Sequence, residues 1–264
     1  MNQVPPTKVK PRSISIGDGS DTRAIALLRQ EGDPAKHGLF WLSGFKSSMM
    51  GEKATAIAAW ATEANHTFTR FDYSGHGLSG GAFEEGTISR WLGEALAVFT
   101  SETTGPQVMI GSSMGGWIAL LLARALQDKE RLRGMVLIAP AWDMTERLMW
   151  ARFPHAIKSE IRDKGFFERP SAYGDGPYTI TNTLIEDGKR HLIGDDSFQV
   201  GCPIHILHGR EDVDVPYGHG QDLLTRLPFD DVRFTLVPDG DHRLSRPQDL
   251  DLMLQAIQGI TEAD

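Results

Sequence analysis

Ser113 has the sequence surroundings of a catalytic nucleophile. It is the third residue of Gly-Ser-Ser-Met-Gly at positions 111–115, between a strand-like apolar run at 107–110 and a helical apolar run at 117–126. A very tight turn from strand to helix strains the dihedral angles of its central residue and leaves no room for side chains at its flanks. The turn also lifts the central hydroxyl above the sheet. The spacing selects Ser113 rather than Ser112 as the nucleophile. The alternative is that this glycine-rich turn only joins a strand to a helix.

His242 is the candidate base for this serine. It ends the sequence Asp-Gly-Asp-His at 239–242, between the last strand-like run and the final helical segment. An imidazole with an ordinary pKa of about 6.5 accepts the serine proton near neutrality and returns it to the leaving group. The alternative is a histidine that only caps a loop.

Asp212 is the acid expected to orient this histidine. It belongs to His-Gly-Arg-Glu-Asp-Val-Asp-Val-Pro at 208–216, directly after a strand-like run at 204–207. Its carboxylate would accept a hydrogen bond from the far ring nitrogen of His242, fix the tautomer and stabilise the imidazolium. Asp214, two residues further on, is the rival.

The oxyanion of an acyl-transfer intermediate needs backbone N–H donors. One is expected from Met114, the residue after the nucleophile. The other is expected from Phe45, in Ser-Gly-Phe at 43–45 after a central strand. With Ser113, Asp212 and His242 these donors would form a complete acyl-transfer site, for which we expect no cofactor and no metal.

Short runs rich in β-branched and aromatic residues alternate with longer helical patterns, as in a mostly parallel sheet covered by helices. The glycines at 17 and 19 favour an antiparallel pair at the start of this sheet. About eight strands are expected, at 13–16, 23–29, 38–42, 67–71, 107–110, 135–138, 204–207 and 232–237, with helices at 53–63, 88–100, 117–126, 220–227 and 247–260.

Residues 143–200 break this alternation and are predicted to form a helical cap inserted into a single domain of residues 1–264. The insertion is rich in large apolar side chains, which either line an acyl pocket under the cap or only dock the cap onto the body. They are Met144, Leu148, Met149, Trp150, Phe153, Ile157, Ile161, Phe166 and Phe167.

Composition excludes several classes of protein. The chain has 264 residues, a formal net charge of −8, 40% hydrophobic and 23% charged residues, which describes a globular fold and disfavours nucleic acid as a partner. No apolar run approaches the roughly 20 residues of a transmembrane helix. The first eleven residues lack the apolar stretch of a secretory signal, so a cytoplasmic protein is expected, with its oligomeric state open.

Three features look functional and are interpreted as structural. Cys202 is the only cysteine and is assigned to packing. Gly75 to Gly80 match the spacing of a dinucleotide-binding loop, but no helix follows at once. His205, His208 and His219 match no zinc motif, and His208 is expected beside the triad.

The motifs together resemble the α/β-hydrolases, over nearly the whole chain. They are Arg-Phe-Asp-Tyr-Ser-Gly at 70–75, Gly-Ser-Ser-Met-Gly-Gly-Trp at 111–117, His-Gly at 208–209 with Asp212 and Val-Pro at 215–216, and Gly-Asp-His-Arg at 240–243. The chain order serine, aspartate, histidine is also that of this fold. More narrowly, 71–75, 111–117, Cys-Pro at 202–203 and Asp-His-Arg at 241–243 resemble the mitochondrial α/β-hydrolase-domain protein ten and its bacterial relatives.

That resemblance implies hydrolysis of acyl thioesters such as S-palmitoyl-cysteine, and of acyl-glucuronide esters, by a triad of Ser113, Asp212 and His242 without a cofactor. The mitochondrial members begin with a transit peptide, and this chain has little sequence before its first strand. A bacterial or cytoplasmic form is therefore expected.

Other activities use the same triad on the same fold. A peptidase, a carbon–carbon bond hydrolase and a cofactor-free haloperoxidase all remain open, as does a non-catalytic protein that uses the pocket to bind a ligand. Dehalogenases and epoxide hydrolases are disfavoured, because their nucleophile is an aspartate and this chain has Ser113 there.

Overall fold

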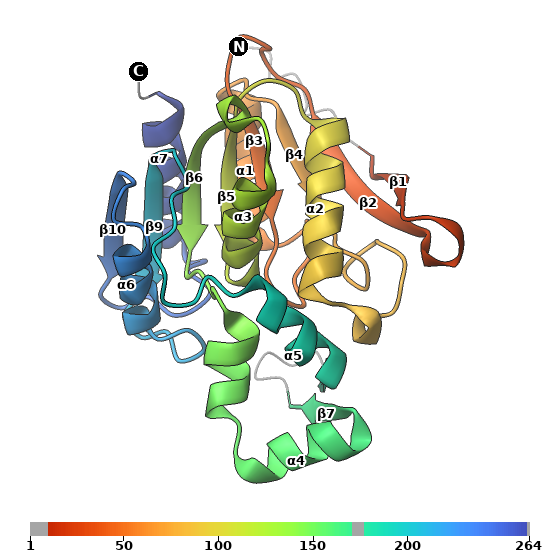
Figure 1. The fold of residues 1–264 in the computed structure, drawn as a ribbon. Coiled ribbons are helices and arrows are strands. Elements are labelled where there is room, and N and C mark those ends of the chain that lie inside the picture. The colour runs from red at the N-terminus through yellow and green to blue at the C-terminus, as the bar shows by residue number, and fades with distance from the viewer. Residues whose placement is uncertain (1–9, 171–176, 263–264) are drawn as a thin grey trace.

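The centre of the molecule is an eight-stranded sheet with the strand order β1-β2-β4-β3-β5-β6-β9-β10 (Figure 1). A computed structural model describes residues 10–170 and 177–262. The strands of the sheet are β1 (Arg12–Ile16), β2 (Arg23–Gln30), β3 (Gly38–Leu42), β4 (Phe68–Phe71), β5 (Gln107–Ser112), β6 (Leu132–Ile138), β9 (Ile204–Gly209) and β10 (Val232–Val237).

The sheet is mostly parallel. Strand β2 pairs antiparallel with β1 and with β4, and all pairs from β4 through β3, β5, β6 and β9 to β10 are parallel. The predicted eight strands and the antiparallel opening pair are confirmed. The carboxyl ends of the parallel strands consequently share one edge, where the loops after β3, β5, β9 and β10 meet.

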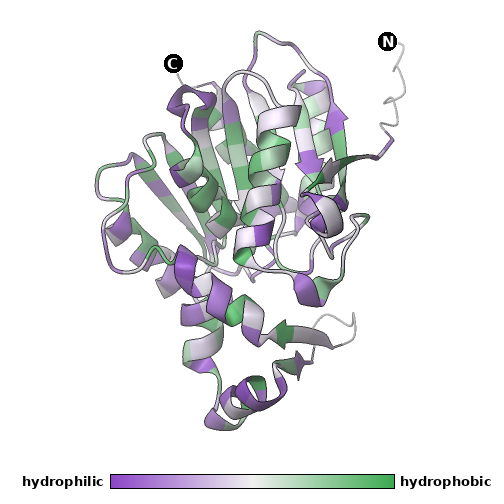
Figure 2. Ribbon diagram, turned by 45° about the vertical axis from the view of Figure 1, so that its right-hand side comes forward, coloured by the Kyte–Doolittle hydropathy of each residue, from purple (hydrophilic) through white to green (hydrophobic). Residues whose placement is uncertain are grey.

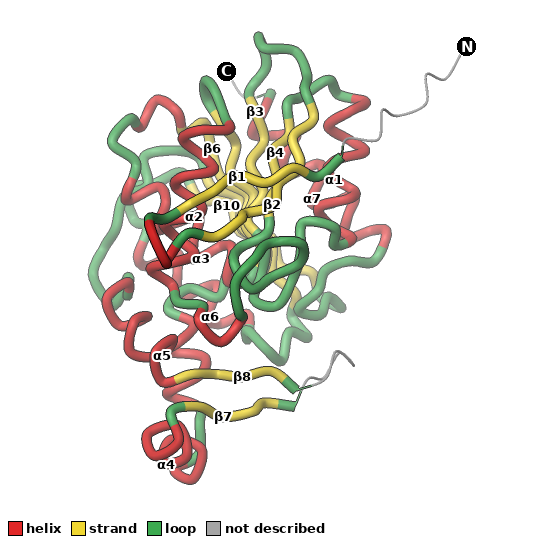
Figure 3. The backbone as a smooth tube through the Cα atoms, turned by 90° about the vertical axis from the view of Figure 1, so that its right-hand side faces the viewer, coloured by secondary structure: helices red, strands yellow, loops and turns green. Residues whose placement is uncertain are grey.

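Helices cover both faces of the sheet (Figures 1 and 3). Helices α1 (Glu52–Glu63) and α7 (Pro247–Thr261) pack on one face, and α2 (Ile88–Glu102), α3 (Met114–Ala125) and α6 (Tyr217–Arg226) on the other. The expected α/β architecture is confirmed. Within residues 10–170 and 177–262, no helix has the length and apolar character needed to cross a membrane.

The alternation of side chains along the strands divides the core into two layers. On β3, Leu39 and Trp41 belong to the layer under α1 and α7, whereas Phe40 and Leu42 belong to the layer under α2 and α3. Central strands therefore carry apolar residues on both sides, and hydrophobic colour is concentrated on them in Figure 2. This burial on both faces is typical of a parallel sheet between helices.

Segment 143–200 joins β6 to β9 and extends beyond the carboxyl edge of the sheet (Figure 1). It contains a π-helical turn (Met144–Met149), α4 (His155–Lys164) and α5 (Asn182–Gly188). It also contains an antiparallel pair, β7 (Phe166–Arg169) and β8 (Tyr178–Thr181), separate from the main sheet (Figure 3). The sequence reading did not include these strands, because four residues are too few to show a period of two.

Asp143 fastens the two ends of this segment to each other. Its buried carboxylate accepts hydrogen bonds from the N–H groups of Ile193, at 2.7 Å, and Gly194, at 2.9 Å. Burial raises the pKa of Asp143, and these two bonds and Arg147 oppose that rise. A single residue thus closes the loop of chain that forms the segment.

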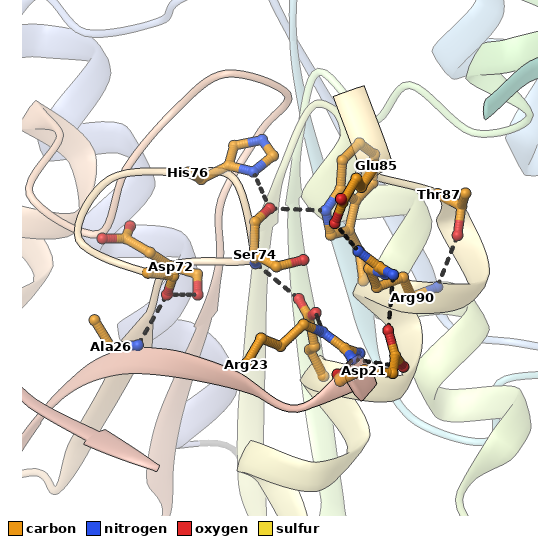
Figure 4. Close-up of polar contacts among 12 residues, drawn as sticks. Asp21, Arg23, Ala26, Asp72, Ser74, His76, Glu85, Thr87 and Arg90 are labelled. Carbon is orange, nitrogen blue, oxygen red and sulfur yellow. Dashed lines mark hydrogen bonds and ion pairs between the residues drawn. The ribbon is translucent and has the colours of Figure 1, made fainter. Parts of the chain in front are cut away.

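A buried carboxylate, Glu94 on α2, ties three elements together. It accepts hydrogen bonds from the Arg23 guanidinium on β2 and, at 2.9 Å, from the backbone N–H of Ser74 in the loop after β4. The Glu94 side chain has no exposed surface. Arg23 in turn contacts Asp21, which Arg90 also binds (Figure 4). The loop after β4 is therefore anchored, through Glu94, to a series of ion pairs that continues to Arg90.

We expect Glu94→Leu to lower the free energy of unfolding by roughly 3–5 kcal/mol, because it leaves the Arg23 charge and the Ser74 N–H without their buried acceptor. Urea unfolding measures this change. The matched control is Glu31→Leu, since Glu31 also binds an arginine, Arg29, but its side chain is 71% exposed. A loss of at most about 1 kcal/mol is expected there. Equal losses in the two variants would contradict the role of Glu94.

Candidate active site

Ser113 occupies a strained turn between β5 and α3. Its backbone angles, φ 54° and ψ −119°, lie outside the regions that a non-glycine residue prefers. The turn is held by hydrogen bonds to β6 and to the loop after it: the Ser113 N–H donates to the Ile138 carbonyl at 2.8 Å, and the Ser113 carbonyl accepts from the Ala141 N–H at 3.0 Å. These contacts lock the strained conformation that the sequence pattern predicts.

Glycine is needed on both sides of this serine because the backbones approach closely. A Cβ on Gly111 would lie 2.4 Å from the carbonyl oxygen of Gly115, and one on Gly115 would lie 2.0 Å from that of Leu42 at the end of β3. Real Cβ atoms do not come so near to backbone atoms. The glycines at 111 and 115 therefore have the steric reason inferred from the sequence.

His242 lies between Ser113 and Asp212. Its Nε2 is 3.0 Å from Oγ of Ser113, and its Nδ1 is 2.7 Å from Oδ2 of Asp212. If Nδ1 carries the proton and donates it to the carboxylate, Nε2 is left as an acceptor for the serine hydroxyl. The structure brings all three predicted side chains into hydrogen-bonding contact.

The Asp212 carboxylate is fully buried and bound on both oxygens. Its Oδ1 accepts from the N–H groups of Asp214 at 3.0 Å and Val215 at 2.7 Å. Burial alone raises the pKa of Asp212, but His208, His242 and the Val215 N–H stabilise the anion and hold the pKa at about 2. The carboxylate is therefore ionised at neutral pH. Asp214, the rival acid, donates its backbone N–H to Asp212, and Nδ1 of His242 is bound to Asp212.

His208 is a second histidine at this carboxylate. It is fully buried, its Nε2 donates to the Val215 carbonyl at 2.8 Å, and the same nitrogen lies 3.5 Å from Oδ2 of Asp212. It therefore packs beside the triad as expected from its place at the end of β9. Its approach to the carboxylate itself was not expected from the sequence.

The loop after β3 passes directly beside the nucleophile. A Cβ on Gly44 would lie 3.3 Å from Cβ of Ser113, and Phe45 follows Gly44 in this loop. Met114 is the first residue of α3, where helix geometry leaves the N–H without an intrahelical partner. Both backbone segments predicted to bind the oxyanion thus adjoin Ser113.

Lys53 on α1 supports the loop of His242, and the sequence analysis missed it. Its ammonium donates to the carbonyl of Arg243, the residue after His242, and lies 3.5 Å from Oγ of Ser245. Burial lowers the pKa of Lys53 to about 8. No local signal marks such a residue, because its partner is 190 positions away.

A cavity of about 750 Å³ opens at Ser113 and His242, between the carboxyl edge of the sheet and segment 143–200. This volume is typical of small-molecule sites. Segment 143–200 contributes Tyr178, Arg152, Arg169 and an apolar wall of six residues, namely Met144, Leu148, Met149, Phe153, Ile157 and Phe167. The cavity also has charged lining residues, namely the cations Lys46, Lys53, Arg152, Arg169 and Arg243 and the acids Glu52 and Asp214.

The features interpreted as structural have structural partners. Cys202 is buried, which raises its thiol pKa to about 12. His219 stacks on Trp142 and His205 contacts Thr235 on β10. Among the described residues, no group of three or more His, Cys, Asp or Glu side chains is arranged to hold a metal ion.

The chain belongs to the alpha/beta hydrolase family, whose sequence pattern matches residues 37–251. The fold and the elbow at Ser113 agree with this assignment.

Within the family, the chain is similar to ABHD10. The human mitochondrial palmitoyl-protein thioesterase ABHD10 is 32% identical over 251 residues, which are 95% of this chain and 80% of that protein. Among solved structures, mouse alpha/beta hydrolase domain-containing protein 10 matches with a TM-score of 0.84 and 30% identity, over 95% of this chain and 98% of that one. A hydrolase structure from Agrobacterium vitis S4 matches with a TM-score of 0.92 and 45% identity, over 97% and 100% of the two chains. The resemblance inferred from the motifs is confirmed.

We expect Gly115→Ala to move the Ser113 turn away from β3, because the added Cβ would lie 2.0 Å from the Leu42 carbonyl oxygen. The kcat for ester hydrolysis should fall about 100-fold or more, since small displacements of a reacting group have effects of this size. The control is Gly93→Ala on α2, where a Cβ meets nothing within 4 Å. That variant should keep wild-type kcat, and a fully active Gly115→Ala enzyme would show that the close approach is not required.

Proposed function

We propose that this protein is a serine hydrolase of carboxylic esters and thioesters, with Ser113 as nucleophile, His242 as base and Asp212 as the orienting acid. The observation that carries the proposal is the unbroken pair of contacts from Ser113 Oγ to His242, at 3.0 Å, and from His242 to Asp212, at 2.7 Å. The family assignment and the ABHD10 relatives support the hydrolase class.

The reaction follows from this geometry in two halves. Nε2 of His242 takes the proton of Ser113 as its oxygen attacks the carbonyl carbon, and the N–H groups of Met114 and Phe45 bind the oxyanion. The intermediate collapses, the bond to the leaving sulfur or oxygen breaks, and His242 returns the proton to it. Water then attacks the acyl-enzyme by the same route and releases the acid and free Ser113.

The apolar wall of the cavity is the place for the acyl chain. It comes from the segment between β6 and β9 and lines the same cavity as Ser113. The ABHD10 relatives are named palmitoyl-protein thioesterases, which agrees with an acyl chain that is long and apolar. We therefore propose acyl thioesters and esters ahead of amides, carbon–carbon bonds or haloperoxidase chemistry.

The leaving group is proposed to be neutral or anionic. Five cations and two acids line the cavity, although the whole chain has a net charge of −8. Clefts lined mainly by one sign of charge favour ligands of the opposite sign. An acyl-glucuronide, whose sugar bears a carboxylate, fits this lining, whereas a cationic leaving group does not.

The cytoplasmic location expected from the sequence stays a proposal, because the ABHD10 relatives are named as mitochondrial proteins. A non-catalytic binding role is the alternative from another class. It is disfavoured because the three side chains are in contact and the cavity reaches Ser113 and His242.

Substitution of the triad tests the mechanism. Ser113→Ala and His242→Gln should each lower kcat for p-nitrophenyl butyrate by on the order of 10⁴ or more, and Ser113→Ala should abolish labelling by a fluorophosphonate. Ser112→Ala, at the neighbouring serine, should still be labelled. Asp212→Asn should lower kcat about 10⁴-fold. Asp214→Asn should lower kcat by a factor at least 100 times smaller. A Ser113→Ala protein that keeps its turnover would refute the proposal.

The acyl wall predicts a dependence on chain length. For thioesters of increasing length, kcat/KM should rise roughly fourfold per added methylene until the cavity is filled, because each buried methylene contributes about 0.8 kcal/mol. Phe167→Ala should reduce this gain and leave acetyl thioester turnover unchanged. The matched control is Phe166→Ala on the adjacent position of β7, which is 41% exposed and does not line the cavity. A flat length profile, or equal effects of the two variants, would contradict the placement of the acyl chain.

A further inference from the structure

The turn that carries Phe45 has an unfavourable backbone conformation. It is closed by a hydrogen bond of 3.1 Å from the Ser47 N–H to the Gly44 carbonyl, and its third residue, Lys46, has a φ of 57°. A left-handed conformation at a residue with a side chain costs roughly 1–2 kcal/mol, and glycine is usual at such a position. The turn therefore needs a contact that holds Lys46 in place.

That contact is His76, from the loop after β4. The Lys46 N–H donates to Nε2 of His76 at 3.1 Å. On the other side of the ring, Nδ1 lies 3.1 Å from the Ser74 carbonyl, so Nδ1 is the nitrogen that carries the proton. Burial lowers the pKa of His76 to about 4. The ring is therefore neutral at physiological pH, and Nε2 has a free lone pair for the Lys46 N–H.

The His76 ring is itself fixed from several directions. It is 4% exposed and packs against the rings of Tyr73, Phe83 and Trp91, with centroid distances of 5.8, 5.2 and 5.2 Å. The carbonyl that it binds, on Ser74, also accepts from the Trp91 indole at 3.2 Å. Figure 4 shows His76 above Ser74, whose backbone is anchored in turn through Glu94.

We propose that His76 is a positioning residue of the acyl-transfer reaction: its neutral ring holds the Gly44–Ser47 turn in the conformation that presents the Phe45 N–H to the oxyanion. The proposal rests on the proposed function and adds a specific requirement to it. His76 does not line the cavity at Ser113, so its effect passes through the turn, by the hydrogen bond from the Lys46 N–H and by a ring contact with Phe45 at a centroid distance of 6.4 Å.

The test compares acceptor-free and acceptor-bearing side chains at position 76. We expect His76→Leu to lower kcat per fluorophosphonate-titrated site by about 10- to 100-fold, somewhat less than the loss of a whole oxyanion donor, with KM within threefold of wild type. Its affinity for a trifluoromethyl ketone, which forms a tetrahedral adduct, should fall in parallel. His76→Gln, which offers an amide oxygen near the Nε2 position, should recover at least half of the lost log kcat.

The control histidine is His66, because it is also buried, stacks on Trp60 and binds a backbone carbonyl, that of His37, at 2.8 Å. His66→Leu should keep wild-type kcat per active site even where it lowers the melting temperature. If His76→Leu does not fold, His76→Asn takes its place, since its shorter amide does not reach the Nε2 position, and the same loss is expected.

Lys46→Gly supplies a rescue that a general packing role would not give. Glycine adopts the positive φ without cost, so in the His76→Leu background it should restore part of kcat, beyond its effect in the wild type. The proposal would be overturned if His76→Leu left kcat unchanged. It would also be overturned if His76→Leu lowered kcat by the same factor in the Lys46→Gly background as in the wild type. Ser113→Ala is run in the same assay: turnover there would refute the serine mechanism, whichever result position 76 gives.

Discussion

The close approach of α3 to the end of β3 is the constraint on which the site depends. With no side chain at Gly115, the first turn of α3 can touch the Leu42 carbonyl, and the backbone of Ser113 can bend between β3 and β6. The strain of this bend, of order 1–3 kcal/mol, is offset by hydrogen bonds to Ile138 and Ala141. The nucleophile is thus held by main-chain atoms of β3, of β6 and of the loop after β6 rather than by its own side chain.

The parallel arrangement brings the remaining groups to this point. Ser113 and His242 are 129 positions apart and Asp212 and His242 are 30 apart, yet each lies after the carboxyl end of a strand in the parallel part of the sheet. The aspartate loop follows β9, the histidine loop follows β10, and the Phe45 turn follows β3. The order of strands in the sheet therefore brings together residues that are far apart in the sequence, which no local interaction could do. The loops need only short side-chain contacts to complete the site.

How much the sequence reveals depends on whether the physical cause is local. The elbow at 111–115, the eight strands and the antiparallel opening pair were predictable, because glycine spacing and hydrophobic period act within a few residues. Asp212 is preferred over Asp214 already from the sequence, but both follow β9, and only the fold places one of the two carboxylates, that of Asp212, against His242. Likewise, no local sequence pattern predicts that the Lys46 N–H binds His76 or that the Arg243 carbonyl binds Lys53, because each partner is distant in the chain. The strands β7 and β8 could not be predicted, because each is too short to show an alternating hydrophobic pattern.

The hydrogen bonds of Asp143 to Ile193 and Gly194 bring the two ends of a roughly 50-residue excursion together at one place on the body. Since the ends are already joined, the length and sequence between them can vary without altering the spacing of β6 and β9, and closing a longer loop adds little entropy cost. The segment between Asp143 and Gly194 can therefore be replaced as a whole, in evolution or by protein engineering. Such a replacement would change the wall proposed to bind the acyl chain and leave the reacting groups in place.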